Sequence, residues 1–187
     1  MEGNDTEFFS VKGEYMGFQI VKQNIVEMGT DAIVNAANTG LSRGSGVCGA
    51  IFYAAGAKKL QEECDKKAPC PTGKAVLTNA YQLKAKYIIH AVGPVWNGGA
   101  YGEKEQLHSA YESALELASE NGCTSIAFPL ISAGIYGYPK KEAMETAVSS
   151  ILQFLEKCEM EVFLVLFDEE SFQVAETFFG QYVKKEK

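Results

Sequence analysis

Residues 33–49 read IVNAANTGLSRGSGVCG, and they decide the fold. The apolar run at 31–37, DAIVNAA, suits a buried strand and ends in polar residues. A loop rich in glycine and serine follows, and a helix-like run then extends over about 47–66. The stretch therefore predicts a strand that leads through a glycine-rich loop into a helix.

The same alternation continues along the chain. Further strand signals occur at 15–26, 74–80, 86–92, 124–131 and 161–168, and further helix signals at 104–121, 140–158 and 169–183. Pro139 suits the first turn of the helix that follows it. Alternating strands and helices predict a layered α/β domain with a largely parallel sheet. Ligands bind such sheets beyond the carboxyl ends of the strands, so we expect the chemistry in the loops 36–47, 132–138 and 168–171.

The composition limits the classes of function. The 187 residues are 47% apolar and 22% charged, which is ordinary for a single globular domain. Residues 1–14 are expected to extend this domain or to add a short edge strand. The N-terminal segment lacks the features of a signal peptide and no stretch matches a transmembrane helix, so we expect a cytoplasmic monomer without a membrane partner.

The charge and the cysteines exclude other partners. A net charge of −7 does not favour nucleic acid, and a bound anion is expected to contact backbone amides rather than a basic patch. The five cysteines are irregularly spaced, and only His90 and His108 could join them as metal ligands. The sequence therefore predicts neither a disulfide framework, nor a zinc site, nor a cofactor.

The glycines Gly44, Gly46 and Gly49 satisfy the G-x-G-x-x-G pattern of dinucleotide-binding turns. That pattern requires a glycine directly after the strand, whereas Gly44 comes nine positions after Asn35, and the region expected to hold the acidic residue reads CDKKAPC. The dinucleotide interpretation is therefore disfavoured. Two others stay open on this loop alone: backbone amides at a helix N-terminus that hold a phosphate, or a turn with glycines for geometry only.

A second loop favours the phosphate interpretation. PLISAGIYGYP at 129–139 places three small residues directly after a strand, and an isoleucine and a tyrosine follow them: Ser132, Ala133, Gly134, Ile135 and Tyr136. Two such loops beyond neighbouring strands could hold a diphosphate between them. Tyr136 either covers a sugar or phosphate or packs in the interior.

The strings IVNAANTGL, GSGVCGAIFYAAG, IIHAVGP and FPLISAGIYGYP, in this order and spacing, resemble the macrodomain family over about 18–179. The resemblance implies a three-layer α/β/α macrodomain with a mixed central sheet and a cleft for ADP-ribose. It also implies, as in many members, hydrolysis of ADP-ribose from proteins or from O-acetyl-ADP-ribose. The implied partners are ADP-ribose and mono-ADP-ribosylated proteins.

The resemblance assigns residues to the adenine end of that cleft. Asn24 takes the place of the family aspartate that holds the adenine amino group, and its side-chain carbonyl can still accept a hydrogen bond. Ile25 would offer its backbone amide to the adenine ring. Phe167 would either stack on adenine or belong to the core of the strand.

The resemblance also assigns the diphosphate and the distal ribose. Asn38 would hydrogen-bond the distal ribose, and Asn35 is expected to brace the loop. The amides of Gly44, Gly46 and Val47 would contact one side of the diphosphate, and the residues from Ser132 to Tyr136 the other.

Two positions depart from the hydrolases of MacroD type. Cys48 replaces the aspartate that positions the catalytic water, and Phe52 replaces a histidine. A neutral thiol cannot act as the base. Asn38, Asn35 and Cys48 are the candidate catalytic residues: a helix N-terminus could lower the pKa of Cys48 and make its thiolate a nucleophile, although no histidine lies near in sequence to activate it. Viral macrodomains that resemble this sequence include hydrolases without the aspartate. Two functions therefore remain: a mono-ADP-ribosyl hydrolase that relies on positioning, which is favoured, and a reader that binds without turnover.

Overall fold

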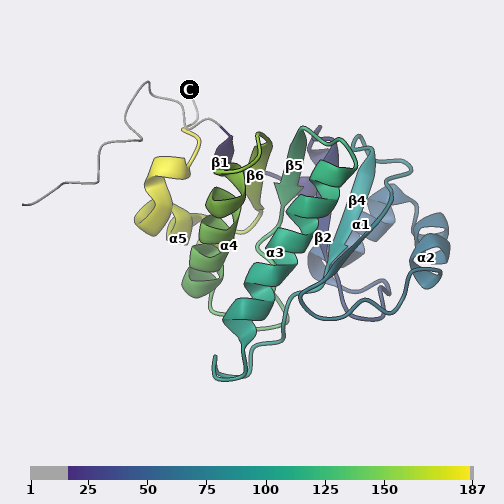
Figure 1. Cartoon of the computed structure of the whole chain (residues 1–187), viewed down its shortest axis with the longest axis horizontal. Coiled ribbons are helices and arrows are strands. Elements are labelled where there is room, and N and C mark those ends of the chain that lie inside the picture. The colour runs from purple at the N-terminus through teal and green to yellow at the C-terminus, as the bar shows by residue number, and fades with distance from the viewer. Residues whose placement is uncertain (1–16, 186–187) are drawn as a thin grey trace, which may run out of the picture.

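Within residues 17–185, which the computed structural model describes, six strands form one sheet (Figure 1). The strands are β1 (Phe18–Lys22), β2 (Ala32–Ala36), β3 (Ala75–Asn79), β4 (Tyr87–Ala91), β5 (Ser125–Phe128) and β6 (Glu161–Leu166). Their order is β1-β6-β5-β2-β4-β3, and every neighbouring pair is parallel except β3 with β4. The predicted mixed, largely parallel sheet is confirmed. The expectation for residues 1–14 lies outside the described residues.

Helices cover both faces of the sheet, as the three-layer prediction requires. They are α1 (Gly46–Ala55), α2 (Ala57–Asp65), α3 (Glu103–Glu120), α4 (Lys140–Leu155) and α5 (Glu169–Phe179). Short 3-10 turns span Ile25–Glu27 and Gly180–Tyr182. Figure 1 shows α3 and α4 across one face and α1 and α2 on the other, with α5 beside α4.

Several element boundaries differ from the prediction for local reasons. The helix expected over about 47–66 is two helices, because Gly56 adopts a left-handed φ of 98° that ends α1 and starts α2. The strand expected at 124–131 ends at Phe128, and the next residue is Pro129, which has no amide hydrogen for the sheet. Pro139 lies at the N-cap of α4 rather than in its first turn.

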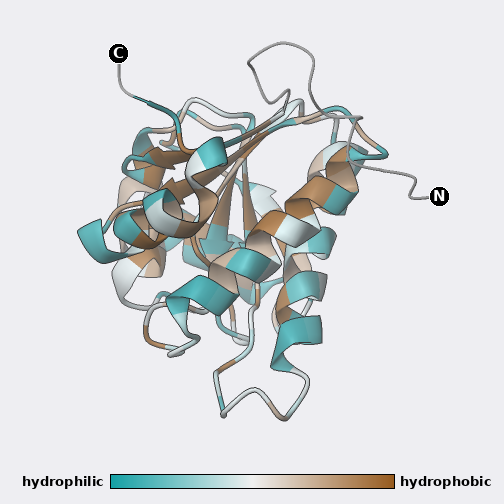
Figure 2. Cartoon of the chain, turned by 90° about the vertical axis from the view of Figure 1, so that its left-hand side faces the viewer, coloured by the Kyte–Doolittle hydropathy of each residue, from teal (hydrophilic) through white to brown (hydrophobic). Residues whose placement is uncertain are grey.

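The core consists of two apolar clusters, one on each face of the sheet. Alternate strand residues divide between them: Val34 joins the cluster under α3 and α4, whereas Ile33 joins the cluster under α1 and α2. In Figure 2 the strands are brown at the centre, and the helices around them carry teal on their outer faces. The alternation places Asn35, two residues after Ile33, on the α1 side as well.

The chain direction brings the functional loops to one end of the sheet. Because β2, β4, β5 and β6 are mutually parallel, the segments that follow them leave from the same edge. Within residues 17–185, no helix combines the length and the apolar character needed to span a membrane.

Candidate functional site

A cleft of about 710 Å³ lies beyond the carboxyl ends of β2, β5 and β6. Nearly all the residues predicted for the site line it: Asn24, Ile25, Asn38, Gly44, Gly46, Val47, Cys48, Ser132, Ala133, Gly134, Ile135, Tyr136 and Phe167. Asn35 is buried below the cleft and does not line it. The structure therefore brings together four stretches of the sequence, at 24–25, 38–48, 132–136 and 167.

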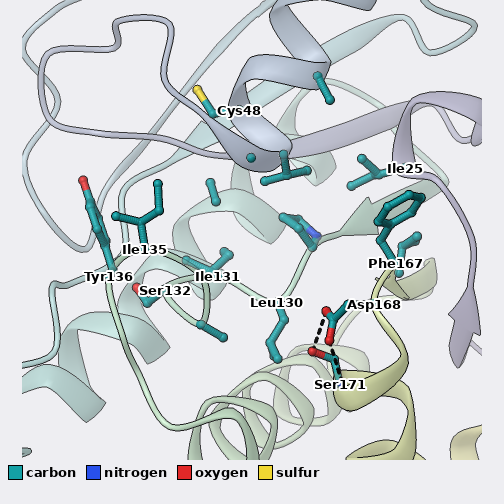
Figure 3. A pocket seen from close by; sticks show the side chains of 18 of the residues that line it. Ile25, Cys48, Leu130, Ile131, Ser132, Ile135, Tyr136, Phe167, Asp168 and Ser171 are labelled. Carbon is teal, nitrogen blue, oxygen red and sulfur yellow. Dashed lines mark hydrogen bonds between the residues drawn. The ribbon is translucent and has the colours of Figure 1, made fainter.

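Phe167 marks one end of the cleft, close to Ile25 (Figure 3). Its side chain is 76% exposed, so the alternative that it belongs to the strand core is wrong. It follows directly after β6, where the chain leaves the sheet. An exposed aromatic ring in a cleft is suited to stack against a flat ligand.

Asn24 lies at the same end and caps the short turn Ile25–Glu27. Its Oδ1 accepts a hydrogen bond of 3.3 Å from the backbone amide of Val26. An amide oxygen has two lone pairs, so Oδ1 can accept one further hydrogen bond. Asn24 can therefore serve the turn and a ligand amine together.

The glycine-rich loop leads directly into the first turn of α1. Gly46 has a left-handed φ of 59°, and Ser45 at the N-cap makes no side-chain capping bond. A Cβ at Gly49 would lie 2.7 Å from the carbonyl oxygen of Gly44, so only glycine lets the loop lie against the helix. The first residues of α1 line the cleft, so the positive end of the helix dipole lies at the cleft wall.

Ser132 is the most unusual residue of the second loop. It is 5% exposed, adopts a left-handed φ of 67°, and its hydroxyl has no hydrogen-bond partner among the described residues. Gly93 makes room for it, because a Cβ there would lie 2.2 Å from Ser132 Oγ. A strained residue with an unpartnered buried hydroxyl, lining a cleft, is typical of a ligand contact. Sequence reasoning found Ser132 and missed Gly93.

Tyr136 lies in the same loop, which hydrogen bonds hold in shape. The amide of Tyr138 donates to the Ser132 carbonyl at 2.9 Å, and the amide of Trp96 donates to the Tyr136 carbonyl at 2.8 Å. Tyr136 is half-buried and lines the cleft, whereas the buried position belongs to Tyr138. Tyr136 is therefore not packed in the interior, and its role toward a sugar or phosphate stays a prediction.

Asn38 closes the turn that precedes the glycines. Its Nδ2 donates to the Ser42 carbonyl at 2.9 Å, and its Oδ1 accepts from the Ser42 amide at 3.1 Å and from the Ser42 hydroxyl at 3.2 Å. Asn38 thus braces this loop through Ser42, and Asn35 contacts the wall through Cys48 at 3.6 Å. One Nδ2 hydrogen of Asn38 remains available to the cleft.

Asn35 belongs to a buried network beneath this wall. Its Nδ2 lies 3.1 Å from His90 Nδ1 and 3.6 Å from Cys48 Sγ, and its Oδ1 has no partner among the described residues. An amide nitrogen only donates, so Nδ1 accepts and the ring proton is on Nε2. Nε2 lies 3.0 Å from the hydroxyl of Thr78, which itself donates to a backbone carbonyl. Burial lowers the pKa of His90 to about 4, so the ring is neutral at pH 7.

Cys48 makes no contact with a base. Its thiol donates to the Ser42 carbonyl at 3.8 Å, and His90 is reached only through the amide of Asn35. Phe52 is fully buried, with its ring centroid 6.2 Å from that of His90. The neighbourhood of Cys48 thus offers hydrogen bonds and shape, but no group to remove its proton.

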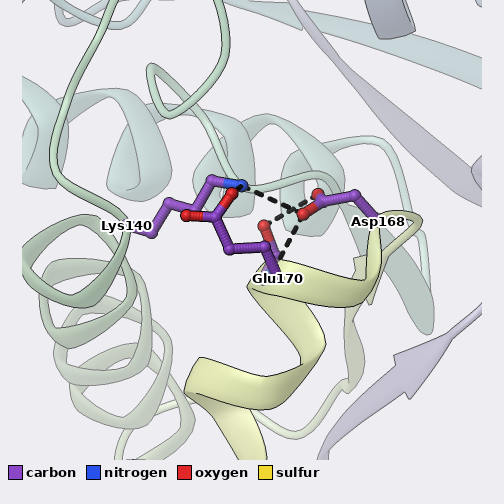
Figure 4. A network of polar contacts seen from close by, with 4 residues as sticks. Lys140, Asp168 and Glu170 are labelled. Carbon is purple, nitrogen blue, oxygen red and sulfur yellow. Dashed lines mark hydrogen bonds and ion pairs between the residues drawn. The ribbon is translucent and has the colours of Figure 1, made fainter.

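Lys140, Asp168 and Ser171 also line the cleft. Asp168 and Ser171 lie in the predicted loop 168–171, but none of the three was predicted as a site residue. Asp168 caps α5: its carboxylate accepts from the amide and the hydroxyl of Ser171, both at 2.8 Å. Lys140 Nζ donates to Asp168 at 3.0 Å and to Glu170 at 2.9 Å (Figure 4). An aspartate directly before a helix is the local signal that could have identified Asp168, whereas no local pattern points to its partner Lys140.

Comparisons with known proteins agree with this geometry. Residues 34–147 match the model of the Macro domain. A Macro domain-containing protein of Methanosarcina mazei is 51% identical over 155 residues, 82% of each chain. The O-acetyl-ADP-ribose deacetylase of Salmonella gallinarum is 46% identical over 159 residues, 82% of this chain and 88% of that protein. A variant of the Oceanobacillus iheyensis macrodomain solved with ADPR superposes with a TM-score of 0.83 at 37% identity, over 89% of this chain and 95% of that one.

Proposed function

The chain belongs to the Macro domain family, and on this premise we propose that it binds ADP-ribose and hydrolyses mono-ADP-ribose esters. One observation carries the proposal: two loops of small residues line a single cleft, and one of them holds the buried, unpartnered hydroxyl of Ser132. A diphosphate supplies the acceptors that this hydroxyl and the amides of α1 require. The solved relatives with ADPR and with ADP support this occupant.

The cleft suggests how ADP-ribose would lie. Adenine would stack on Phe167, with its amino group toward Asn24 and its ring beside the Ile25 amide. The diphosphate would lie between the first turn of α1 and the loop from Ser132 to Tyr136. The distal ribose would then reach the wall formed by Asn38 and Cys48, where the remaining Nδ2 hydrogen of Asn38 can bind a ribose hydroxyl.

The proposed reaction is hydrolysis of an ester between ADP-ribose and an Asp or Glu side chain. Water adds its oxygen to the anomeric carbon as the bond from that carbon to the ester oxygen breaks. The carboxylate leaves with the bonding electron pair, and a water proton passes to solvent. The protein contributes by holding the ribose and diphosphate in place, and a phosphate oxygen of the substrate orients the water.

The surroundings of Cys48 support a mechanism without a side-chain base. The thiol hydrogen already points to the Ser42 carbonyl, and the neutral His90 accepts a hydrogen bond from Asn35 instead of from Cys48. A reaction that depends on positioning requires a good leaving group. We therefore expect anomeric carboxylate esters to react, including O-acetyl-ADP-ribose with its acetyl group on the anomeric oxygen, and Arg-linked ADP-ribose to remain intact. The name of the Salmonella gallinarum relative supports the O-acetyl substrate.

A non-catalytic reader of ADP-ribosylated proteins is the second candidate. Cys48 favours it, because no carboxylate lines the cleft near this residue to activate water. A time course on an Asp/Glu-linked mono-ADP-ribosylated protein separates the two functions, with Asn38→Ala and an Arg-linked substrate alongside. Release by the wild type that is lost in Asn38→Ala supports the hydrolase. Tight ADP-ribose binding without release supports the reader, and equal turnover of the Arg-linked substrate contradicts the positioning mechanism.

A further inference from the structure

Lys140 and Asp168 are the formally charged side chains among the described residues that line the cleft. Every other lining residue is apolar, glycine or neutral and polar. Asp168 directly follows Phe167, the residue proposed to face adenine. An ion pair with only a structural role does not need to line a ligand site. The position of this pair in an otherwise neutral cleft therefore points to a role in ligand binding.

The carboxylate of Asp168 is held in a fixed orientation. Its Oδ1 accepts from the Ser171 amide and Lys140 Nζ, and its Oδ2 accepts from the Ser171 hydroxyl. Desolvation raises its pKa, but the hydrogen bonds from Ser171 and Lys140 outweigh this and lower the pKa to about 2. The group is therefore ionised at neutral pH, and Oδ2 keeps a lone pair for a further donor.

The charge around Asp168 is negative. Lys140 is the cation of this cluster, and the carboxylates of Asp168 and Glu170 share it (Figure 4). Glu169, the first residue of α5, lies between these two acids in the sequence and pairs with Lys22. A hydroxyl donor would gain a charged acceptor here, whereas a phosphate monoester would add up to two negative charges beside two carboxylates.

We infer that Asp168 accepts a hydrogen bond from a ribose hydroxyl of the adenosine part, and that the Asp168 carboxylate excludes a phosphate from that ribose. The inference rests on the proposed function, because adenine beside Phe167 and the diphosphate between the two loops leave the adenosine ribose next to Asp168. The site thus takes ADP-ribose with free hydroxyls and rejects ADP-ribose 2′-phosphate.

Calorimetric titration of the wild type with ADP-ribose and with ADP-ribose 2′-phosphate tests the inference. We expect the phosphorylated ligand to bind at least about tenfold more weakly. In Asp168→Asn the ratio is expected to fall to about threefold or less. Asparagine is itself a good N-cap, so this variant keeps the start of α5.

Glu170→Gln is the matched control. Glu170 has the same charge as Asp168 and also pairs with Lys140, but it does not line the cleft. This variant is expected to keep most of the discrimination. Equal affinities of the wild type for the two ligands would overturn the inference and leave ADP-ribose binding intact. An equal loss of discrimination in Glu170→Gln would overturn the direct role of Asp168. Failure of the wild type to bind either ligand would overturn the proposed function as well.

Discussion

Two polar networks support the cleft, and they differ in burial and in charge. Asn35, Thr78 and His90 are fully buried beneath the wall that holds Cys48, and they carry no charge at neutral pH. The Lys140–Asp168–Glu170 cluster lies at the end marked by Phe167, reaches solvent and is charged throughout. Because the first network is buried, solvent cannot replace a hydrogen-bond partner that a substitution removes. This network therefore determines the stability of the wall. In the exposed cluster, water can replace a lost ion-pair partner, so the cluster contributes little to folding stability. We expect it to affect which ligand binds.

The change in the free energy of unfolding at acid pH should distinguish the two networks most strongly. The pKa of His90 in the folded protein, about 4, lies below its ordinary value of 6.5, so the unfolded chain binds its proton first as the pH falls. The contribution of His90 to stability is complete above pH 6.5 and is lost as the pH falls toward 4, a loss of about 3 kcal/mol. Urea unfolding between pH 7 and 4 measures it.

His90→Gln is the control for this titration, and its unfolding free energy should fall less over the same range. Asp168 stays ionised down to its pKa of about 2, so its contribution to stability is complete above pH 4 and changes little between pH 7 and 4. An unchanged acid slope in His90→Gln would show that the buried network is not responsible.

Removal of Asn35 should give the next largest effect. Asn35→Leu keeps the approximate volume but leaves His90 Nδ1 without its donor, so we expect the free energy of unfolding to fall by about 2 kcal/mol. The double variant Asn35→Leu/His90→Leu should cost less than the sum of the two single variants. Strictly additive costs in this cycle would contradict a coupled network.

Gly93→Ala sharpens the comparison at Ser132, which belongs to neither network and is proposed to contact the ligand. The new Cβ would meet Ser132 Oγ at 2.2 Å and an atom of Ile131 at 2.5 Å, so the loop must move. We expect ADP-ribose to bind about tenfold more weakly, or about 1.4 kcal/mol. Gly29→Ala, where an added Cβ meets nothing within 4 Å, should bind as the wild type does. Unchanged affinity in Gly93→Ala would argue against a role for Ser132.

Glu170→Gln should have the smallest effect on stability. The Glu170 side chain is largely exposed, so its ion pair with Lys140 is expected to contribute about 0.5 kcal/mol or less. Urea unfolding at low salt and at 1 M salt measures this contribution. A loss similar to that of Asn35→Leu would remove the distinction between the two networks.

The sequence predicted the order of strands and helices, because hydrophobic periodicity and glycine-rich loops are local signals. The sequence also predicted nearly every residue of the two loops that lines the cleft. The contact between Asn35 and His90 depends on the register of β2 against β4, which no local pattern contains. The contacts of Gly93 with Ser132 and of Lys140 with Asp168 also join residues that are distant in the sequence, so no local pattern predicts them. The brace that Asn38 makes with Ser42 was not predicted, because spacing shows which residues are near but not which way their side chains point.

The most direct test of the account is a crystal structure with ADP-ribose. The account predicts that a diphosphate oxygen lies within hydrogen-bond distance of Ser132 Oγ and of the amides at the start of α1, with adenine against Phe167. A structure in which ADP-ribose binds elsewhere, or in which the diphosphate lies in solvent and the Ser132 hydroxyl stays without a partner, would contradict it.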